Sequence, residues 1–384
     1  MSESPLVNYQ LTSQQTQQLI QLRQYLHEHP ELSNLEFQTQ KACISALESI
    51  PVDDIQRIGT SVIAKISGRN VSGDPIIIRG DIDALPIQEA SGHPYQSRQS
   101  GVMHACGHDI HTTWAIGAAH LLAKQRIDRD VYILLQQAEE TAEGATYLLN
   151  SGQLPKSCVA VIGGHVDPRY ELGQVVHHEG AISSASSRFE IEVLGKAAHA
   201  ARPEEGQSPI PALVKIIQQL ETDSNQLGDA TNFISITQIN AGLKHNIIPD
   251  KATVSGTLRC LSTQAENQLK AAISNYEQLD LGCAIYSSIT DMSPVLLNHA
   301  ALSASAAQAI AMTLGPSGRV PLHRPNMASE DFGFYSQHYP TWYFRIGSTA
   351  KGAPFVPVHT PEFFAPEAVI EIGARLFANM AAII

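Results

Sequence analysis

Apolar residues along this chain follow three patterns, and the first of them predicts helices. Residues 12–29 and 36–50 carry apolar side chains every three or four positions, as one buried face of a helix requires. Thr12 and Gln15 fit a capping box at the start of the first helix, and Pro30 follows its end. The chain is therefore expected to begin with a pair of helices.

The second pattern consists of continuous apolar runs, which suit strands buried on both faces of a sheet. These runs occupy residues 76–78, 131–135, 159–162 and 342–346. A helical pattern at residues 112–124 separates the first two runs, and strands that alternate with helices predict a largely parallel sheet. The expected fold class is α/β, with a mixed, mostly parallel sheet and helices on both of its faces.

In the middle of the chain the apolar pattern changes to alternation, which is typical of strands with one exposed face. Strand, helix, strand, strand, helix and strand follow one another at residues 189–193, 209–220, 233–237, 252–259, 263–278 and 284–289. This is the order of a ferredoxin-like α+β domain. Residues 183–292 are therefore expected to form an insert, with residues 1–182 and 293–384 forming one catalytic domain.

Composition narrows the choice of partners. The chain is 43% apolar and 16% charged, as in an ordinary globular enzyme, and its net charge of −12 argues against nucleic acid and anionic membranes. A small molecule or a peptide remains as the expected partner.

Met1 to Gln10 shows no leader pattern and no later run approaches a membrane span, so a cytoplasmic protein is expected. Five scattered cysteines without a C-x-x-C pair indicate neither a disulfide framework nor a zinc ribbon.

The candidate chemistry begins in the stretch MHACGHD at residues 103–109. A thiol and an imidazole separated by one glycine can turn toward the same point, and these are ligands that suit zinc. Taken alone, the pair could equally be a buried thiol beside a surface histidine. Five residues that follow apolar runs would, however, meet at the carboxyl edge of one sheet: Cys106, His108, Glu140, His165 and His359. Together they predict a metal site.

A set of motifs, in order along almost the whole chain, resembles the dinuclear metallo-amidohydrolases. The motifs are RGDIDALPI (79–87), MHACGHD (103–109), QAEE (137–140), GGH (163–165), GKAAHAARP (195–203), HNIIPD (245–250), GTLR (256–259), ASEDFG (328–333) and VHTPEF (358–363). The nearest branch resembles hippurate hydrolases, N-acyl-amino-acid amidohydrolases and plant auxin-conjugate hydrolases. Aminoacylase and carboxypeptidase G are more distant relatives.

The resemblance implies two divalent metal ions per chain, with zinc or manganese favoured over cobalt or nickel. It implies that Cys106 bridges the ions, that Glu140 and His359 bind one, and that His108 and His165 bind the other. It also implies that Glu139 is the general base and that Asp83 orients a metal-bound imidazole. Asp81 stands where distant relatives carry a histidine ligand, which argues against Asp81 as a ligand here.

The resemblance implies that the insert is a lid and dimerisation domain, from which His199, Asn246 and Arg259 reach the substrate. His199 would donate to the developing oxyanion, and Arg259 would pair with a substrate carboxylate. Without the resemblance, Arg259 would be read as a surface strand residue. Glu204 departs from the branch, which usually has a histidine there. The resemblance allows a homodimer formed through the insert, and leaves open whether His199 acts in its own site or in its partner's.

The predicted function is hydrolysis of the amide bond of N-acyl amino acids, by a metal-activated water with Glu139 as base. Two alternatives remain: a catalytically weak relative that only binds metal and ligand, and a metallo-carboxypeptidase or dipeptidase acting on short peptides. A pure binder would not need a second carboxylate beside Glu140. Serine hydrolases, P-loop enzymes and dinucleotide-binding enzymes are disfavoured because the chain lacks their motifs.

Overall fold

The chain divides into two compact units in the computed structural model, which describes residues 9–69, 73–226 and 231–384. The first unit comprises 1–180, 297–323 and 334–384, and the second comprises 181–296 and 324–333. The predicted insert ran from 183 to 292, so the segment 324–333 was not anticipated as part of the second unit. Residues 1–8, which belong to the stretch without a leader pattern, lie outside the described residues.

The first unit is built on an eight-stranded sheet with the order β1-β2-β4-β3-β5-β16-β6-β15. Its strands are β1 (Asp54–Ile58), β2 (Ser61–Ile66), β3 (Ile76–Asp81), β4 (Val131–Gln136), β5 (Ala160–Glu171), β6 (Val175–Val176), β15 (Arg319–Val320) and β16 (Thr341–Thr349). The four central strands, β4, β3, β5 and β16, are parallel to one another. β2 joins β4, and β6 joins β16, in the antiparallel sense. The predicted mixed, mostly parallel sheet is confirmed.

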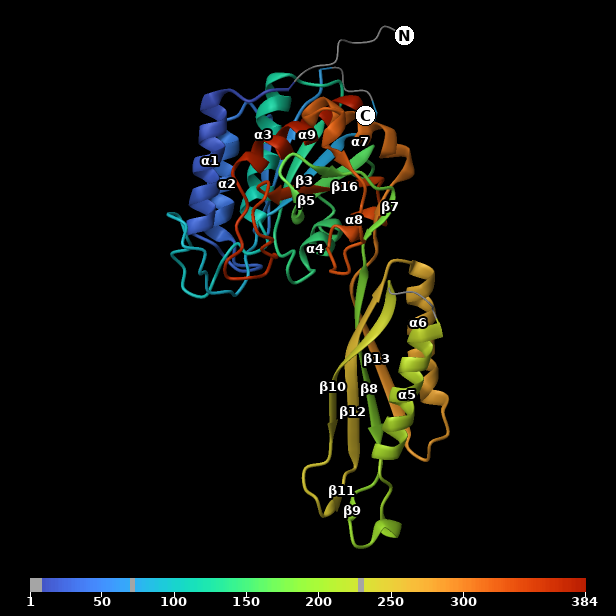
Figure 1. The fold of residues 1–384 in the computed structure, drawn as a ribbon. Helices are drawn as coiled ribbons and strands as arrows, with labels where there is room; N and C mark the ends of the chain where they lie inside the picture. The colour runs from blue at the N-terminus through green and yellow to red at the C-terminus, as the bar shows by residue number, and fades with distance from the viewer. Residues whose placement is uncertain (1–8, 70–72, 227–230) are drawn as a thin grey trace. The chain divides into compact units, whose positions relative to one another are not determined.

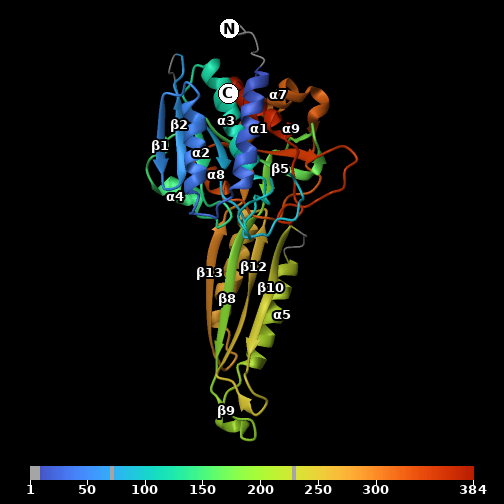
Figure 2. The same cartoon turned by 90° about the vertical axis from the view of Figure 1, so that its left-hand side faces the viewer.

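Helices of the first unit pack around this sheet (Figure 1). They are α1 (Ser13–Glu28), α2 (Phe37–Glu48), α3 (His108–Lys124), α4 (Gly144–Asn150), α7 (Ser303–Leu314), α8 (Gly333–Ser336) and α9 (Ala368–Ile383). α3 packs against α1, α9 and β3, and α9 packs against α7, in one layer (Figures 1 and 2). Trp114 of α3 meets Phe377 of α9 edge to face at 5.5 Å between ring centroids. The predicted capping box is present, because Thr12 and Gln15 exchange side-chain-to-backbone hydrogen bonds.

Two predicted boundaries near the candidate site were wrong. α3 begins at His108 and not at Thr112, because Gly107 adopts a left-handed conformation (φ 88°) that turns the chain directly into the helix. β5 does not end before His165 but continues to Glu171, because β16 pairs with it beyond that point. Both corrections place a candidate ligand inside a regular element.

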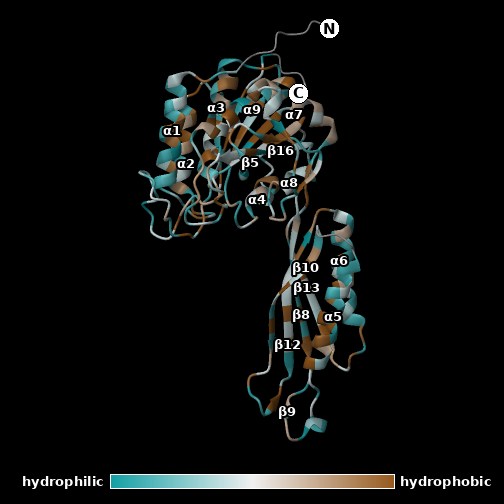
Figure 3. Ribbon diagram, viewed as in Figure 1, coloured by the Kyte–Doolittle hydropathy of each residue, from teal (hydrophilic) through white to brown (hydrophobic). Residues whose placement is uncertain are grey.

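The second unit has the predicted ferredoxin-like order. It contains β8 (Ala185–Leu194), α5 (Ile210–Gln226), β10 (Asn232–Ala241), β12 (Lys251–Cys260), α6 (Thr263–Asn275) and β13 (Ala284–Ser293), with the sheet order β10-β12-β8-β13. Apolar residues of the sheet and of the two helices form its core, including Phe189, Ile216 and Val254. Figure 3 shows how apolar residues line the strands and the inner sides of helices within each unit.

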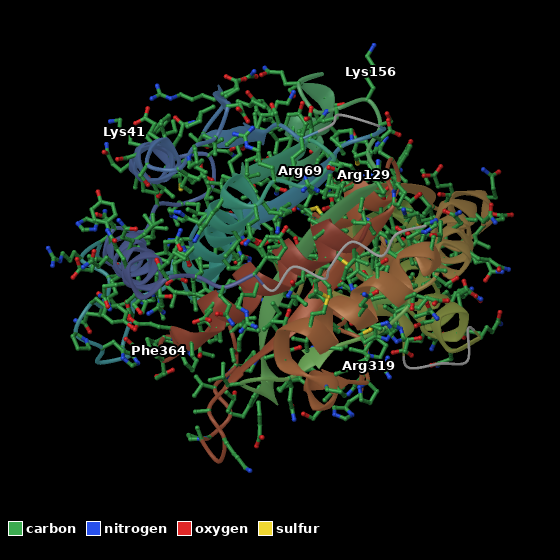
Figure 4. All side chains as sticks on the ribbon, turned by 90° about the horizontal axis from the view of Figure 1, so that it is seen from above. Lys41, Arg69, Arg129, Lys156, Arg319 and Phe364 are labelled. Carbon is green, nitrogen blue, oxygen red and sulfur yellow. The ribbon has the colours of Figure 1, made fainter. Side chains whose placement is uncertain are left out.

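Short elements complete the chain. They are β7 (Gly180–Ser183), β9 (Ala198–His199), β11 (Ile247–Ile248), β14 (Leu296–Asn298) and the 3-10 turns Pro203–Glu205, Tyr276–Gln278, Ala300–Leu302 and Pro316–Gly318. Exposed basic side chains such as Lys41, Lys156 and Arg319 project from separate parts of the first unit (Figure 4). In the described ranges, no helix has the length and apolar character needed to cross a membrane.

Candidate metal centre

The four parallel strands of the first unit bring the candidate ligands to one edge of the sheet. Asp83 follows β3, Glu139 and Glu140 follow β4, His165 lies in the second half of β5, and the loop after β16 carries His359. Cys106 and His108 stand at the start of α3, which packs on β3. The expected meeting of these residues at the carboxyl edge therefore occurs, as parallel strand order dictates.

Among the groups of possible ligand atoms in the described residues, two share one thiol. Cys106, His108 and His165 make one group, and Cys106, Glu140 and His359 make the other, with the atoms of each group within 4.8 Å of one another. The Cys106 Sγ lies 3.2 Å from Nε2 of His165 and 3.1 Å from Nε2 of His359. Two atoms that bind the same zinc ion at 2.0–2.3 Å are at most about 4.6 Å apart, so each group has dimensions suited to one ion.

Two buried atoms at this place lack the partners that burial demands. Nε2 of His108 and Oε1 of Glu140 are both buried and have no hydrogen-bond partner among the described residues. They lie 3.7 Å apart. Unsatisfied buried polar atoms cost free energy unless something binds them, and divalent ions held by the two ligand groups would satisfy both atoms. The donor set of thiolate, imidazole and carboxylate fits a divalent transition metal.

Local backbone geometry turns the ligands inward. At Gly107 an added Cβ would lie 2.6 Å from Cγ2 of Val166, so only glycine fits between the two ligands that flank it. His359 also has a positive φ of 63°, and its N–H donates to the Ala105 carbonyl over 2.8 Å. A non-glycine residue in this conformation is strained, and such strain is common at functional sites.

Asp83 connects two of the candidate ligands. Its Oδ1 lies 3.1 Å from Nδ1 of His108, and its Oδ2 accepts from the Glu140 N–H over 3.0 Å and from the Ser33 hydroxyl over 2.7 Å. Burial alone would raise the pKa of Asp83, but these hydrogen bonds hold it below its usual value. The carboxylate fixes Nδ1 of His108 as the protonated nitrogen, which leaves Nε2 facing the site.

A second buried network lies behind the site and was not found from the sequence. Asp81 bonds to Arg79 and accepts from Nδ1 of His111 over 2.7 Å, and Nε2 of His111 accepts from the Val166 N–H over 3.0 Å. Both oxygens of Asp81 are therefore engaged by protein groups, which agrees with the argument against Asp81 as a ligand. His111 is three residues after His108 on α3, so the helical i, i+3 spacing was the available signal.

The protonation of the site follows from its burial and charges. Burial by itself would lower the pKa of His108, but Asp81, Asp83 and Glu140 raise it to about 10. Burial raises the pKa of Glu140 to about 7. Burial also lowers the pKa of His165 and of His359, which keeps both imidazoles neutral. An ion that binds Nε2 of His108 must therefore displace a proton.

Glu139 is the carboxylate that stands beside the candidate ligands. Its Oε2 lies 3.8 Å from Nε2 of His108, and the residue is only 9% exposed. The two groups of atoms that share Cys106 do not include it, although its carboxylate also lies in a group with His108 and Glu140. A carboxylate at this distance can exchange a proton with a water molecule held between the ligands.

The three candidate residues of the second unit, His199, Asn246 and Arg259, do not all lie together in the structure. His199 pairs with Ile247, and Asn246 accepts through its carbonyl from the Ala200 N–H, so these two residues lie together beyond one end of the sheet. Lys251, the first residue of β12, lies at that end of the sheet. Arg259 lies eight residues farther along the same strand, which places it about 26 Å from Lys251 at the usual strand rise. Nη1 of Arg259 is buried and has no partner within the described ranges.

Comparison with known proteins agrees with this geometry. Residues 77–382 match the model of peptidase family M20/M25/M40. The chain is 36% identical over 339 residues to an N-acetyl-L-cysteine deacetylase of Bacillus subtilis (strain 168), which covers 84% of this chain and 78% of that protein. It is 31% identical over 375 residues to an IAA-amino acid hydrolase of Arabidopsis thaliana, covering 94% of this chain and 84% of the relative.

A solved structure extends the comparison to the fold. A Bacillus subtilis protein described as a dinuclear metal binding peptidase from the M20 family superimposes with a TM-score of 0.86 and 32% identity, covering 97% of this chain and 99% of that one. The chain belongs to peptidase family M20/M25/M40 and is a metal-dependent hydrolase. The family and the fold class that the sequence motifs indicated are confirmed.

Proposed function

We propose that this protein hydrolyses the amide bond of N-acyl amino acids with two divalent ions per chain. The observation that carries the proposal is the pair of ligand groups that share Cys106, with Glu139 beside them. Two relatives are named for cleaving amino-acid conjugates, one an N-acetyl group and the other an indoleacetyl group, which supports this substrate class. Zinc and manganese remain the favoured ions because of the mixed sulfur, nitrogen and oxygen ligands.

In this proposal, separate residues of the chain bind the metal ions, transfer the proton and orient a ligand. Cys106, Glu140 and His359 would hold one ion, and Cys106, His108 and His165 the other. Ions bound there would polarise the amide carbonyl and make water more acidic. Glu139 would take a proton from the attacking water and deliver it to the leaving nitrogen, which must be protonated to depart as an amine. Asp83 would keep His108 in the ligating tautomer.

Residues of the second unit would recognise the rest of the substrate. Arg259 has a buried Nη1 without a partner among the residues described, so a substrate carboxylate would satisfy it. His199 accepts at Nδ1 from the Ala201 N–H over 3.1 Å, so its neutral ring carries the proton on Nε2. That N–H could donate to the oxyanion that develops on the substrate carbonyl. The exposed Asn246 would bind beside it.

One copy of the chain cannot place both His199 and Arg259 on one small substrate. Arg259 lies about 26 Å along β12 from Lys251, and His199 lies beyond that end of the sheet, so the two side chains are farther apart than the length of an N-acyl amino acid. If both residues contact the same substrate, they come from two copies, and this supports a homodimer through the second unit. His199 and Asn246 would then serve the partner's site.

A substrate screen with metal reconstitution tests the proposed function. We expect chelator-treated protein to be inactive, and turnover of N-acetyl, N-benzoyl or indoleacetyl amino acids to return as divalent ions are added. Saturation near two ions per chain, with release of protons, is expected because His108 must lose a proton on binding. Short peptides of matched size serve as the comparison substrates. Full activity without metal, or faster cleavage of peptides than of every N-acyl amino acid, would contradict the proposal.

Replacing Arg259 should affect only substrates with a free carboxylate. Arg259→Ala is expected to lower kcat/KM by about ten- to a hundredfold for an N-acyl amino acid, because a charge-assisted hydrogen bond contributes about 1.5 to 3 kcal/mol. The penalty should vanish for the corresponding amide, which has no carboxylate. Equal losses on both substrates would show that Arg259 acts by stabilising its own sheet instead.

A further inference from the structure

The loop between α1 and α2 carries a buried carboxylate, Glu36, that accepts a hydrogen bond from the segment containing Glu139 and Glu140. Glu36 is fully buried. Its Oε1 accepts from the Ala138 N–H over 2.9 Å, and its Oε2 accepts from the Thr60 hydroxyl over 2.6 Å. Glu36 is also the residue before α2, yet its side chain makes no capping bond to that helix. Its side chain therefore joins the segment after β4, through Ala138, to the turn between β1 and β2, through Thr60.

Ala138 is the point on which that segment turns. It stands directly before Glu139 and has a positive φ of 53°, a conformation that a residue with a Cβ adopts only when its surroundings hold it. Its carbonyl accepts from the N–H groups of Glu143 and Gly144 over 3.2 and 3.1 Å. With the Glu36 bond, the backbone at Ala138 is held through both its N–H and its carbonyl.

A second hydrogen bond fixes the same backbone two residues later, where the Glu140 N–H donates to Asp83 over 3.0 Å. Glu139 lies between these two fixed points. Adjacent glutamates must point in different directions if one is to bind metal while its neighbour stays available to move a proton. The backbone conformation at positions 138–140 determines those directions, because side-chain direction depends on φ and ψ.

We propose that Glu36 is a positioning residue, which sets the geometry of Glu139 and Glu140 through the Ala138 N–H. The proposal rests on the proposed function, in which these two carboxylates have separate roles. Glu36 touches neither substrate nor metal. The simpler alternative is that Glu36 only ties α2 to the sheet and contributes nothing but stability.

Glu31 provides a matched control in the same loop. Its carboxylate accepts from the N–H groups of Gln38 and Thr39, both over 2.8 Å, and so caps α2. Its side chain has no hydrogen bond to the segment after β4 among the described residues. Glu31→Ala should therefore destabilise the protein through α2 and leave kcat of the folded, metal-loaded enzyme unchanged.

Glu36→Ala should instead lower kcat by about a hundredfold at equal metal content, the effect expected when catalytic groups shift by about 1 Å. KM should change little, because the substrate contacts are elsewhere. Glu36→Gln should recover most of the loss, since its amide oxygen can still accept from Ala138 and its amide nitrogen can donate to the Thr60 hydroxyl. A kcat for Glu36→Ala equal to that of Glu31→Ala would overturn the proposal.

Two further measurements separate positioning from stability. In the metal-free protein, hydrogen exchange at the Ala138 amide should accelerate in Glu36→Ala and not in Glu31→Ala, because only the first variant removes its acceptor. The double variant Glu36→Ala, Ala138→Gly should be more stable than Glu36→Ala, since glycine adopts positive φ without strain, but should keep the low kcat. Recovery of wild-type kcat in the double variant, or unchanged exchange at Ala138, would refute the positioning role.

The exchange experiment needs no substrate, so it can fail independently of the proposed function. If the wild type cleaves no N-acyl amino acid, the proposed function fails while the exchange result still stands. If the wild type is active and Glu36→Ala matches it, only the positioning role fails.

Discussion

Glu139→Gln is expected to lower kcat by at least about a hundredfold while KM and metal content stay close to those of the wild type. Glutamine has nearly the size of glutamate but cannot take a proton from water at neutral pH. The Glu139 carboxylate lies 3.8 Å from Nε2 of His108 and outside the two ligand groups that share Cys106. Its loss should therefore remove proton transfer and leave the metal centre in place. Steady-state kinetics together with metal analysis of the same preparation would measure both.

Glu140→Gln is the matched control for this prediction. The two glutamates are neighbours of the same chemical type, but only Glu140 belongs to a group with Cys106 and His359. The control variant should lose metal affinity as well as activity, because a neutral amide is a poorer ligand than a carboxylate. If Glu139→Gln loses metal and Glu140→Gln keeps it, the two roles have been exchanged.

The candidate ligands that follow directly after a strand of the parallel sheet could be predicted from the sequence. Parallel strands place their carboxyl ends on one edge, so Glu140 after β4 and His359 after β16 could be expected near Cys106 without knowledge of side-chain contacts. The helical spacing from Ser13 to Glu28 and its capping box were equally local signals. Each of these inferences depends on a few residues close together in the chain.

The parts that sequence reasoning missed depend on contacts between distant segments. His165 lies inside β5 because β16, about 180 residues later, extends the pairing of that strand. Glu36 has no motif of its own, and its importance appears only when the Ala138 N–H is found to donate to it across the fold. The separation of His199 from Arg259 likewise follows from the register of β12 with β8, which periodicity does not reveal.

Cys106→Ala is expected to abolish binding of two ions and with it all activity. The thiol is the only atom common to both ligand groups, and it stands between Nε2 of His165 and Nε2 of His359. Without it, each remaining group has only two of its three ligands, fewer than the three protein ligands of an ordinary catalytic zinc site. Cys106→Asp should retain part of the binding, because a carboxylate can also bridge two ions.

Cys43→Ala is the control that separates ligand loss from the loss of a buried thiol. Cys43 is a residue of α2 and is fully buried in the apolar core. Its replacement should therefore lower the free energy of unfolding while both ions still bind. Calorimetric titration of metal-free protein, with proton release followed in buffers of different ionisation enthalpy, would compare the variants. Cys106→Ala should release fewer protons than the wild type, because the thiol must ionise in order to bind metal. If Cys106→Ala binds two ions with the affinity of Cys43→Ala, then Cys106 does not bridge the metal centre, and the two ligand groups must be assigned again around another shared atom.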